Sequence, residues 1–309
     1  MQKKFLSCDW GTSSFRLRLA DAMSASVLIE TSNEKGVAAI NNEWMQSQKK
    51  SRELFFKDFL FSQIEKISQT GLSYIPIVIS GMASSSIGMK EISYGKTPFD
   101  ITDDKLPVEH IPADENFQHD ILLVSGLRTE KDVMRGEETM LLGCNTNDDE
   151  QLLIFPGTHS KHVIVKNKVL VDFKTYMTGE IFDLLATKSI LSKSVIKNEN
   201  DSNSFEAGIK DSMKSDLLNS IFHVRTNQLF KKLSEEENYH YLSGLLIGSE
   251  LKQAAESHQN ILLVSSGKLA MFYQRALNIM CPDRNVLYQD ADNALIKGQC
   301  ALAKQYLPS

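Results

Sequence analysis

Hydrophobic and polar positions along the chain predict a run of strands followed by helices. Residues 15–19 alternate apolar and basic side chains, the period of two that is typical of a half-buried antiparallel strand. Residues 51–70 place their apolar side chains on one face of a helix. Further strands are predicted at 5–8 and 26–31, and the continuous apolar runs at 75–80 and 121–125 are typical of parallel strands that are covered on both faces.

The same order of elements returns in the second half of the chain. A strand that ends at residue 155 leads into a turn with Gly157-Thr158, just as the first strand leads into Gly11-Thr12. Two strands and a helix are predicted after each turn. We interpret this pattern as a duplicated unit, which predicts two similar domains at residues 1–145 and 146–309.

The rest of the pattern completes an α/β architecture. The polar segment at 193–237 is expected to form a helical excursion, and strands interleaved with helices return after it. The antiparallel opening of each half predicts mixed sheets. The later elements are expected as helices at 239–256, 269–280 and 293–306 and as strands at 261–266 and 285–288.

Composition narrows the class of protein. The 309 residues are 42% hydrophobic and 24% charged, which is ordinary for a globular protein with enough chain for two cores. The net charge of −5, with no run of Lys and Arg, argues against nucleic acid and membrane surfaces as partners. An anionic ligand must therefore be held by a local cluster of donors.

The cysteines and the N-terminus predict a cytoplasmic protein. The four cysteines lie far apart without metal-ligand spacing, which is typical of buried thiols in a reducing compartment. The first apolar stretch is too short for the core of a signal peptide, and no apolar run reaches the length of a membrane span. The cysteines are Cys8, Cys144, Cys281 and Cys300.

Two polar turns are the first candidates for chemistry. Asp9 ends an apolar strand, and the following Gly11–Ser14 segment offers backbone N–H groups and hydroxyls that can surround an anion. The Asp9 carboxylate suits a hydrated Mg²⁺. On its own this segment reads better as an ordinary tight turn. The second Gly-Thr-x-Ser turn, at residues 157–160, favours a clamp for the phosphates of a nucleotide, although neither a P-loop nor a dinucleotide motif is present.

The segment Arg135-Gly136-Glu137-Glu138 opens a predicted helix. Carboxylates in a first turn favour the helix dipole, and this effect accounts for one of the pair. The other is a candidate general base that takes a proton from a substrate hydroxyl as it attacks a γ-phosphate. The pattern leaves open which of the two glutamates has that role.

Three further segments have a functional and an ordinary interpretation. The loop at 81–90 follows a buried strand, and its serines and Lys90 suit a polyhydroxy acid or simply a solvated loop. Ser266-Gly267 lies between a buried strand and a helix, where it suits adenosine contacts or a plain cap. His159, inside the second turn, is placed to contact phosphate or substrate.

These motifs resemble the actin/Hsp70/sugar-kinase superfamily. Asp9-x-Gly11-Thr12 matches its first phosphate motif and Gly157-Thr158 its second. Arg16 falls where glycerol-kinase-like members have an arginine that contacts phosphate and substrate. Those members carry a G-D-Q segment whose Asp is the catalytic base, and this role passes to Glu137, with Glu138 as the competitor.

At finer resolution the chain resembles the 2-dehydro-3-deoxygalactonokinase family. The segments CDWGTSSFRL, VMRGEETMLLG, FPGTHSKHV and YLSGLLIGSE carry the resemblance, which covers essentially the whole chain. It implies two ribonuclease-H-like (actin-like ATPase) domains with mixed sheets flanked by helices, facing across a cleft. It also implies ATP, Mg²⁺ and 2-dehydro-3-deoxy-D-galactonate as the ligands, with transfer to the 6-hydroxyl.

The resemblance and the turns together give one set of candidate residues. Lys90, Arg135 and Arg16 compete as partners of the substrate carboxylate. The candidates are Glu137 and Asp9 for catalysis, with Asp9 also holding the metal; Gly11, Thr12, Ser13, Ser14, Arg16, Gly157, Thr158, Ser160, Ser266 and Gly267 for the nucleotide; and Ser84, Ser85, Ser86, Lys90, Arg135 and His159 for the sugar acid.

Several alternatives stay open from the sequence alone. The acceptor can be the gluconate epimer or another sugar acid, and the fold also serves nucleotide-dependent binding proteins without kinase activity. A homodimer is possible as well. The helix at 239–256 contains Gly244 and Gly248, which suit close packing either on a neighbouring chain or inside the core.

Overall fold

The computed structural model divides into two compact units. It describes residues 4–47, 49–67, 72, 74–103, 105–198, 203–257 and 260–306. The first unit comprises residues 1–146, 168–172 and 290–309, and the second comprises 147–167 and 173–289. Within the described residues, no helix is both long and apolar enough to cross a membrane.

A six-stranded mixed sheet forms the centre of the first unit. Its order is β3-β2-β1-β4-β8-β7. Neighbouring strands are antiparallel from β1 to β3, β4 and β8 run parallel to β1, and β7 is an antiparallel edge. The strands are β1 (Lys4–Trp10), β2 (Phe15–Asp21), β3 (Val27–Asn33), β4 (Ile77–Gly81), β7 (Val108–Ile111) and β8 (Ile121–Val124).

Smaller elements complete the first unit. A short sheet has the order β10-β9-β5, and β6 (Phe99–Asp100) pairs with the first two residues of β13 (Val169–Tyr176). The predicted helix at 51–70 is observed as α2, and residues 68–70 lie outside the described part of the chain. The other elements are α1 (Val37–Ser47), α2 (Arg52–Ile67), η1 (Met82–Ser84), β5 (Gly95–Lys96), β9 (Leu127–Arg128), β10 (Val133–Met134), α3 (Glu137–Leu142) and α9 (Ala291–Tyr306).

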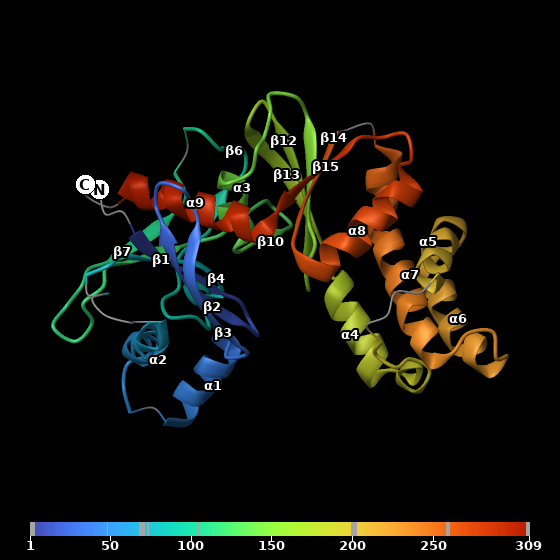
Figure 1. Cartoon of the computed structure of the whole chain (residues 1–309), viewed down its shortest axis with the longest axis horizontal. Coiled ribbons are helices and arrows are strands. Elements are labelled where there is room, and N and C mark those ends of the chain that lie inside the picture. The colour runs from blue at the N-terminus through green and yellow to red at the C-terminus, as the bar shows by residue number, and fades with distance from the viewer. Residues whose placement is uncertain are drawn as a thin grey trace. The chain divides into compact units, whose positions relative to one another are not determined.

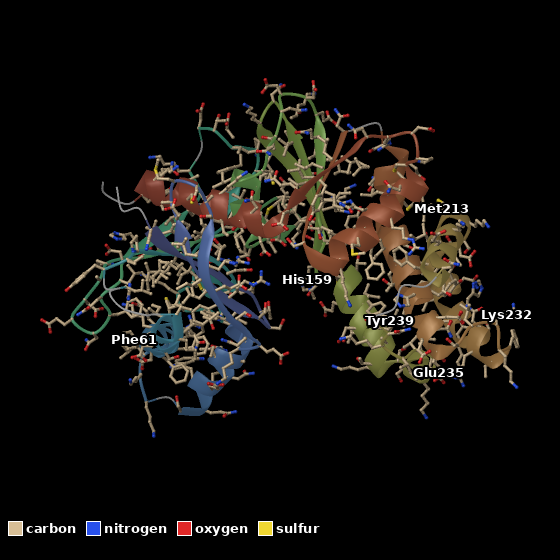
Figure 2. The ribbon with its side chains drawn as sticks, in the orientation of Figure 1. Phe61, His159, Met213, Lys232, Glu235 and Tyr239 are labelled. Atoms are coloured by element: carbon tan, nitrogen blue, oxygen red, sulfur yellow. The ribbon has the colours of Figure 1, made fainter. Side chains whose placement is uncertain are left out.

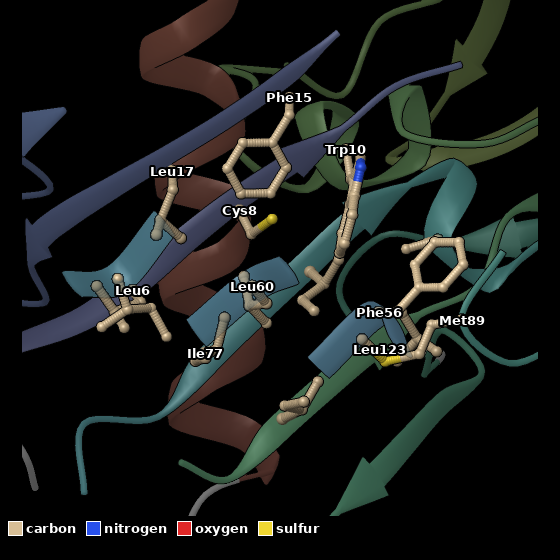
Figure 3. Close-up of a cluster of buried hydrophobic side chains, with 14 of the residues drawn as sticks. Leu6, Cys8, Trp10, Phe15, Leu17, Phe56, Leu60, Ile77, Met89 and Leu123 are labelled. Atoms are coloured by element: carbon tan, nitrogen blue, oxygen red, sulfur yellow. The ribbon is translucent and has the colours of Figure 1, made fainter. Parts of the chain in front are cut away.

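The alternation of β1 separates the core of the first unit from its polar face. Leu6, Cys8 and Trp10 are fully buried on one face, where Trp10 packs at ring distances of 5.0 Å from Phe15 and 5.2 Å from Phe56 (Figure 3). Because successive side chains of a strand point to opposite faces, Asp9 projects to the other side of the sheet. The strand therefore anchors the turn that follows it and presents its carboxylate away from the core.

The last helix groups with the first unit, which differs from the expected division after residue 145. Helix α9 packs against α3 at two glycines. A Cβ atom on Gly298 would lie 1.8 Å from the Thr139 carbonyl oxygen, and one on Gly143 would lie 1.9 Å from that of Ala294. The close approach of these backbones places residues 290–309 with the segment that contains Glu137.

The second unit repeats the sheet of the first. The order β15-β14-β11-β12-β13 corresponds to β8-β4-β1-β2-β3, with β11 antiparallel to β12 and parallel to β14. This correspondence and the flanking helices (Figure 1) confirm the duplicated α/β fold with mixed sheets. The strands are β11 (Gln151–Phe155), β12 (Ser160–Lys166), β13 (Val169–Tyr176), β14 (Asn260–Ser265) and β15 (Val286–Asp290).

Helices make up the rest of the second unit. The predicted excursion at 193–237 contains α5 and α6, and the long helix α7 begins at Glu235, four residues before the expected start. A capping box between Ser234 and Glu237 explains this earlier start. The helices are α4 (Thr178–Lys188), η2 (Ile190–Lys193), α5 (Ser204–Lys214), α6 (Leu217–Leu229), α7 (Glu235–Glu256) and α8 (Gly267–Met280).

The glycines of α7 serve packing inside the chain. A Cβ atom on Gly244 would lie 2.1 Å from the Phe205 carbonyl oxygen, and one on Gly248 would lie 2.2 Å from the Ser212 hydroxyl. Both neighbours belong to α5. Of the two interpretations left open by the sequence, the structure supports the core helix.

Candidate active site

Backbone hydrogen bonds from the start of α1 support the first turn, at residues 11–14. The backbone N–H groups of Val37 and Ala38 donate to the carbonyl oxygens of Gly11 and Thr12 at 2.9 and 3.1 Å. Gly36 lies so close that a Cβ atom there would be 2.3 Å from the Thr12 oxygen. Because the carbonyls of the turn are used on this side, its exposed Thr12, Ser13 and Ser14 remain on the solvent side.

The second turn has the same support. The N–H of Glu180, at the start of α4, donates to the Thr158 carbonyl oxygen at 3.1 Å. A Cβ atom on Gly179 would lie 2.7 Å from the Gly157 oxygen, so this glycine corresponds to Gly36 in the first unit. In both units the start of a helix, with a glycine beside or within its first turn, supports the glycine turn, and helix N-termini favour anions.

A buried hydrogen-bond chain fixes the inner side of the second turn. The N–H of Gly157 donates to Ser160 Oγ at 3.2 Å, and Ser160 Oγ lies 3.1 Å from the Tyr273 hydroxyl. Tyr273 donates to Glu250 Oε2 at 2.6 Å. Burial and the neighbouring Glu250 carboxylate raise the pKa of Tyr273 well above its usual range, so the phenol stays a donor. The chain thus runs from the turn to the buried α7 carboxylate.

Glu250 joins further elements of the second unit. Its side chain is almost fully buried, and it also accepts hydrogen bonds from Thr178 on α4 and from His162 Nε2 on β12, the latter at 3.0 Å. A buried carboxylate with several donors is well satisfied, and losing one donor exposes an uncompensated polar group. Glu250 therefore links α4, α7, α8 and β12 behind the turn.

An apolar cavity of about 200 Å³ lies beside the second turn. Most of its lining residues come from α7 and α8, and Gly157 and Gly179 also line it. Cavities of this kind, apolar with few polar groups, suit the flat face of an aromatic ligand. The lining residues are Gly157, Thr178, Gly179, Phe182, Tyr239, Ser243, Leu246, Ile247, Leu269, Phe272 and Tyr273.

The remaining nucleotide candidates of the second unit, Ser266 and Gly267, lie at the start of α8. Ser266 is the N-cap of α8, and Gly267 has a φ of +62°, a left-handed conformation that favours glycine. A Cβ atom on Gly267 would meet nothing within 4 Å. His159, a candidate for the sugar acid, is exposed (labelled in Figure 2). It is hydrogen-bonded to Glu180 in the first turn of α4.

Charged groups gather on the polar face of β1 and β2. Arg16 Nη1 and Arg18 Nη2 both lie 2.6 Å from Asp292 Oδ1, and the buried Arg18 also donates to Glu30. Burial raises the pKa of Asp9; Arg16 and Arg18 oppose this rise, whereas Asp292 and Glu137 add to it. Asp9 and Glu137 are thus close enough to influence each other.

The two glutamates of the RGEE segment have different surroundings. Glu138 is 1% exposed, and both of its carboxyl oxygens accept from the Gly136 N–H, at 3.0 and 2.7 Å. Burial, followed by the neighbouring Glu137, raises the pKa of Glu138 to about 7. Glu137 is only half-buried, and its Oε2 accepts from the Arg135 N–H at 3.1 Å.

Arg135 connects this segment to the serine loop. Its Nη1 donates to the Ser84 carbonyl oxygen at 2.7 Å and also to the Ser84 hydroxyl. Its guanidinium lies 4.2 Å from the centre of the Tyr94 ring, a cation–π arrangement, and Nε donates to the Tyr94 hydroxyl at 3.3 Å. Arg135, Ser84 and Tyr94 therefore form one cluster.

The other residues of the loop have separate partners. Ser85 Oγ donates to the Met82 carbonyl oxygen at 2.7 Å, and the Ser86 carbonyl oxygen accepts from Arg52 at 2.5 Å. Lys90 forms an ion pair with Glu109 at 2.7 Å on the surface. These contacts hold the loop in place but do not join its members into one site.

Comparison with known proteins identifies the family. The model of the 2-keto-3-deoxy-galactonokinase family matches residues 9–302, which is nearly the whole chain. The chain belongs to this family. The match includes both glycine turns, the serine loop and the RGEE segment.

Individual members of the family are similar over their full length. The Rhizobium meliloti (strain 1021) protein DgoK1, assigned as a 2-dehydro-3-deoxygalactonokinase, is 33% identical over 98% of each chain. The Escherichia coli (strain K12) 2-dehydro-3-deoxygalactonokinase is 29% identical over 91% of each. A solved structure from Sinorhizobium meliloti with the same assignment has a TM-score of 0.84 at 32% identity and covers 99% of this chain and 97% of its own.

Within this family member, sequence reasoning missed several residues around the predicted site. Tyr94, Arg18 and Asp292 lie beside predicted residues of the first unit, and Glu250 and Tyr273 support the second turn. Only the alternation of Arg16 and Arg18 on one strand was a visible signal for any of them. The others come from distant positions in the chain, which periodicity does not connect.

Proposed function

We propose that the chain is an ATP-dependent kinase that transfers a phosphoryl group to the 6-hydroxyl of 2-dehydro-3-deoxy-D-galactonate. The products are 2-dehydro-3-deoxy-6-phosphogalactonate and ADP. The observation that carries the proposal is the family match over residues 9–302, which contains every predicted catalytic segment. The R. meliloti and E. coli relatives are named for this activity. They are similar to this chain over almost their full length.

Each glycine turn is a proposed binding element for the phosphates of a nucleotide. The exposed hydroxyls of Thr12, Ser13 and Ser14, and the turn at 157–160, offer donors on rigid supports. The purine is assigned to the apolar cavity beside Gly157, with Ser266 and Gly267 as further contacts. This proposal rests on the adjacency of cavity and turn within the second unit.

Asp9 is the proposed ligand of Mg²⁺. The described residues contain no cluster of three or more His, Cys, Asp or Glu side chains suited to a metal. Mg²⁺ usually takes only one or two carboxylates together with phosphate oxygens and water. Asp9 fits this role, because burial and two neighbouring carboxylates raise its pKa and a bound cation would offset that cost. When bound, Mg²⁺ neutralises charge on the phosphates.

Glu137 is the proposed base. It takes the proton of the 6-hydroxyl while the oxygen forms a bond to the γ-phosphorus and the bond to the ADP oxygen breaks. The buried carboxyl of Glu138 accepts hydrogen bonds from the Gly136 N–H and from the Thr139 hydroxyl. Its role is to hold the backbone of the segment, which leaves Glu137 to act on the substrate.

The sugar acid is assigned to the cluster around Arg135. An arginine guanidinium is permanently charged and binds carboxylates with two parallel hydrogen bonds. Ser84 and Tyr94 orient it from two sides. Arg135 is therefore preferred over Lys90, which is paired with Glu109, and over Arg16, which is paired with Asp292.

A coupled ADP-release assay tests the function. Purified protein is given ATP·Mg²⁺ with 2-dehydro-3-deoxy-D-galactonate, with the gluconate epimer in parallel and no acceptor as the control. Turnover on the galactonate form well above both other reactions is expected. A preference for the epimer would contradict the substrate assignment, and nucleotide binding without turnover on any sugar acid would contradict the kinase assignment.

A further inference from the structure

Helix α9 covers the polar face of the first sheet. The alternation of β1 places Ser7 and Asp9 on the face opposite to the hydrophobic core. Helix α9 packs on β1 and on the neighbouring β4 (Figure 1). Its Asp292 forms an ion pair with Arg16 of β2, the residue that lies directly opposite Asp9. The helix therefore lies on the same face of the sheet as the proposed metal ligand.

Gln299 of α9 reaches the strands on either side of Asp9. Its side chain is fully buried, and its Nε2 donates to the Cys8 carbonyl oxygen and to Ser80 Oγ, both at 3.0 Å. The Cys8 carbonyl belongs to the peptide group that continues into Asp9, and Ser80 lies opposite Asp9 in the parallel register of β1 and β4. One amide thus holds the peptide group before Asp9 and the residue that faces it.

The orientation of the Asp9 carboxylate depends on the backbone that carries it. Within the described residues, Asp9 has charged neighbours but its carboxylate accepts no hydrogen bond. No donor fixes the side chain directly, so the position of the β1 backbone sets where it points. Gln299 is hydrogen-bonded to that backbone one peptide group before Asp9.

The amide of Gln299 is used at its donor end only. Its Oε1 is buried without a partner among the residues that the structure describes. Burial of an unpaired amide oxygen has an unfavourable free energy, which an apolar side chain of similar size would avoid. Packing alone therefore does not account for a glutamine at this position, whereas its two donated hydrogen bonds do.

The residue before Gln299 joins the same helix to the segment of the proposed base. Gly298 packs so closely on α3 that a Cβ atom there would lie 1.8 Å from the Thr139 carbonyl oxygen. Thr139 follows Glu137 by two residues in the first turn of α3. Two consecutive residues of α9 thus contact the strand that carries Asp9 and the helix that carries Glu137.

We propose that Gln299 is a positioning residue that fixes the Asp9 carboxylate for Mg²⁺ relative to Glu137. The inference rests on the proposed role of Asp9 as metal ligand. Gln299 acts through the Cys8 carbonyl and the Ser80 hydroxyl and not by contact with the metal. Hydrogen bonds are directional, so they hold the end of a strand more precisely than apolar packing does. Loss of the amide is expected to weaken the contribution of Mg²⁺ to nucleotide binding while the chain stays folded.

Calorimetric titration with ADP tests the proposal without any turnover. ADP is titrated in excess Mg²⁺ and again in EDTA, and the ratio of the two dissociation constants measures the contribution of the metal. The wild type is expected to bind ADP several-fold more tightly with Mg²⁺. Gln299→Met, which keeps a similar volume but cannot donate, is expected to lose most of this gain and to keep its dissociation constant in EDTA. An unchanged ratio in this variant would overturn the proposal.

Leu302→Val is the matched control for a general loss of stability. Leu302 is buried on the same helix, three residues beyond Gln299 and further along the helix from Asp292. Its substitution is expected to lower Tm at least as much as Gln299→Met does, because it removes a buried methylene group. The ratio of dissociation constants should nevertheless stay at the wild-type value. An equal loss of the ratio in this control would overturn the positioning role.

Ser80→Ala tests the route from Gln299 to Asp9. Removal of one of the two acceptors is expected to lower the ratio in part. Because Ser80 is proposed to act through the same amide, Ser80→Ala added to Gln299→Met should cause no further loss. A full additional loss in the double variant would overturn the proposed route.

These binding measurements separate the inference from the kinase assignment. If no sugar acid is phosphorylated but the ratios change as expected, the kinase assignment is contradicted and the role of Gln299 is supported. A wild type whose ADP affinity does not respond to Mg²⁺ would overturn this inference together with the assignment of Asp9 to the metal, whatever the turnover.

Discussion

Glu138 directs both of its carboxyl oxygens to the backbone N–H of Gly136, at 3.0 and 2.7 Å. Gly136 has a φ of +114°, which favours glycine, and it immediately precedes Glu137. The buried carboxyl of Glu138 thus fixes the glycine that sets the direction of Glu137. This contact supports the proposal that the two adjacent glutamates have separate tasks, Glu138 in positioning and Glu137 in proton transfer.

Glu137→Gln is expected to lower kcat by about a hundredfold or more, because the amide cannot accept the hydroxyl proton. ATP affinity should change little, as measured by calorimetric titration. Glu138→Gln is the matched control. Its amide oxygen can still accept from Gly136, so its loss of kcat should be much smaller. An equal or larger loss in Glu138→Gln would move the base to that residue.

The raised pKa of Glu138 predicts how stability depends on pH. Its pKa is 4.5 in model compounds and about 7 in the folded chain. Between these values the folded state binds more protons than the unfolded state, so this group makes stability fall as pH rises from about 4.5 to about 7. Glu138→Gln removes the effect. Relative to this variant, the wild type should lose Tm across that window, and parallel Tm profiles would contradict a buried carboxyl of raised pKa.

Arg135→Lys is expected to raise KM for the sugar acid by about tenfold or more while KM for ATP stays near the wild-type value. Lysine keeps the charge but loses both the planar pair of donors and the stacking on Tyr94. Lys90→Ala is the comparison. Because Lys90 forms an ion pair with Glu109, removal of the Lys90 side chain should change KM for the sugar acid little. The reverse order of effects in steady-state kinetics would assign the substrate carboxylate to Lys90.

Tyr273→Phe interrupts the chain between Glu250 and the second turn. Loss of this hydroxyl weakens the support of the second turn, which the proposed function assigns to the nucleotide. It should therefore raise KM for ATP about three- to tenfold and change KM for the sugar acid much less. Tyr306→Phe removes a comparable hydroxyl, which donates to the Leu106 carbonyl oxygen at 2.9 Å in the first unit. If both variants raise KM for ATP equally, the positioning role of Tyr273 is contradicted.

The sequence predicts local structure well, since periodicity and turn residues are local signals. The alternation at Phe15–Leu19 and the Gly-Thr turns are enough to place β1, β2, β11 and β12. Helix α7 begins earlier than the apolar pattern predicts, because the capping box at Ser234 fixes its first turn. Helix α9 was expected in the second domain, and only packing of Gly298 on Thr139 shows where it belongs.

The site is less predictable than the fold, because its supporting contacts join distant parts of the chain. Arg135 reaches Ser84 across 51 residues, and Ser160 reaches Tyr273 across 113. Neither pair has a signature in spacing or composition. The motifs predict which segments carry the chemistry, whereas the partners that orient these segments depend on the tertiary structure.

The reaction itself gives the most direct test of the central claim. Protein, ATP·Mg²⁺ and 2-dehydro-3-deoxy-D-galactonate are incubated and followed by ³¹P NMR without proton decoupling. The account predicts one new phosphomonoester signal, equal in amount to the ADP formed and split into a triplet by the two protons on carbon 6. A doublet would place the phosphate on a secondary hydroxyl, and inorganic phosphate with ADP and no ester would contradict phosphoryl transfer to the sugar acid.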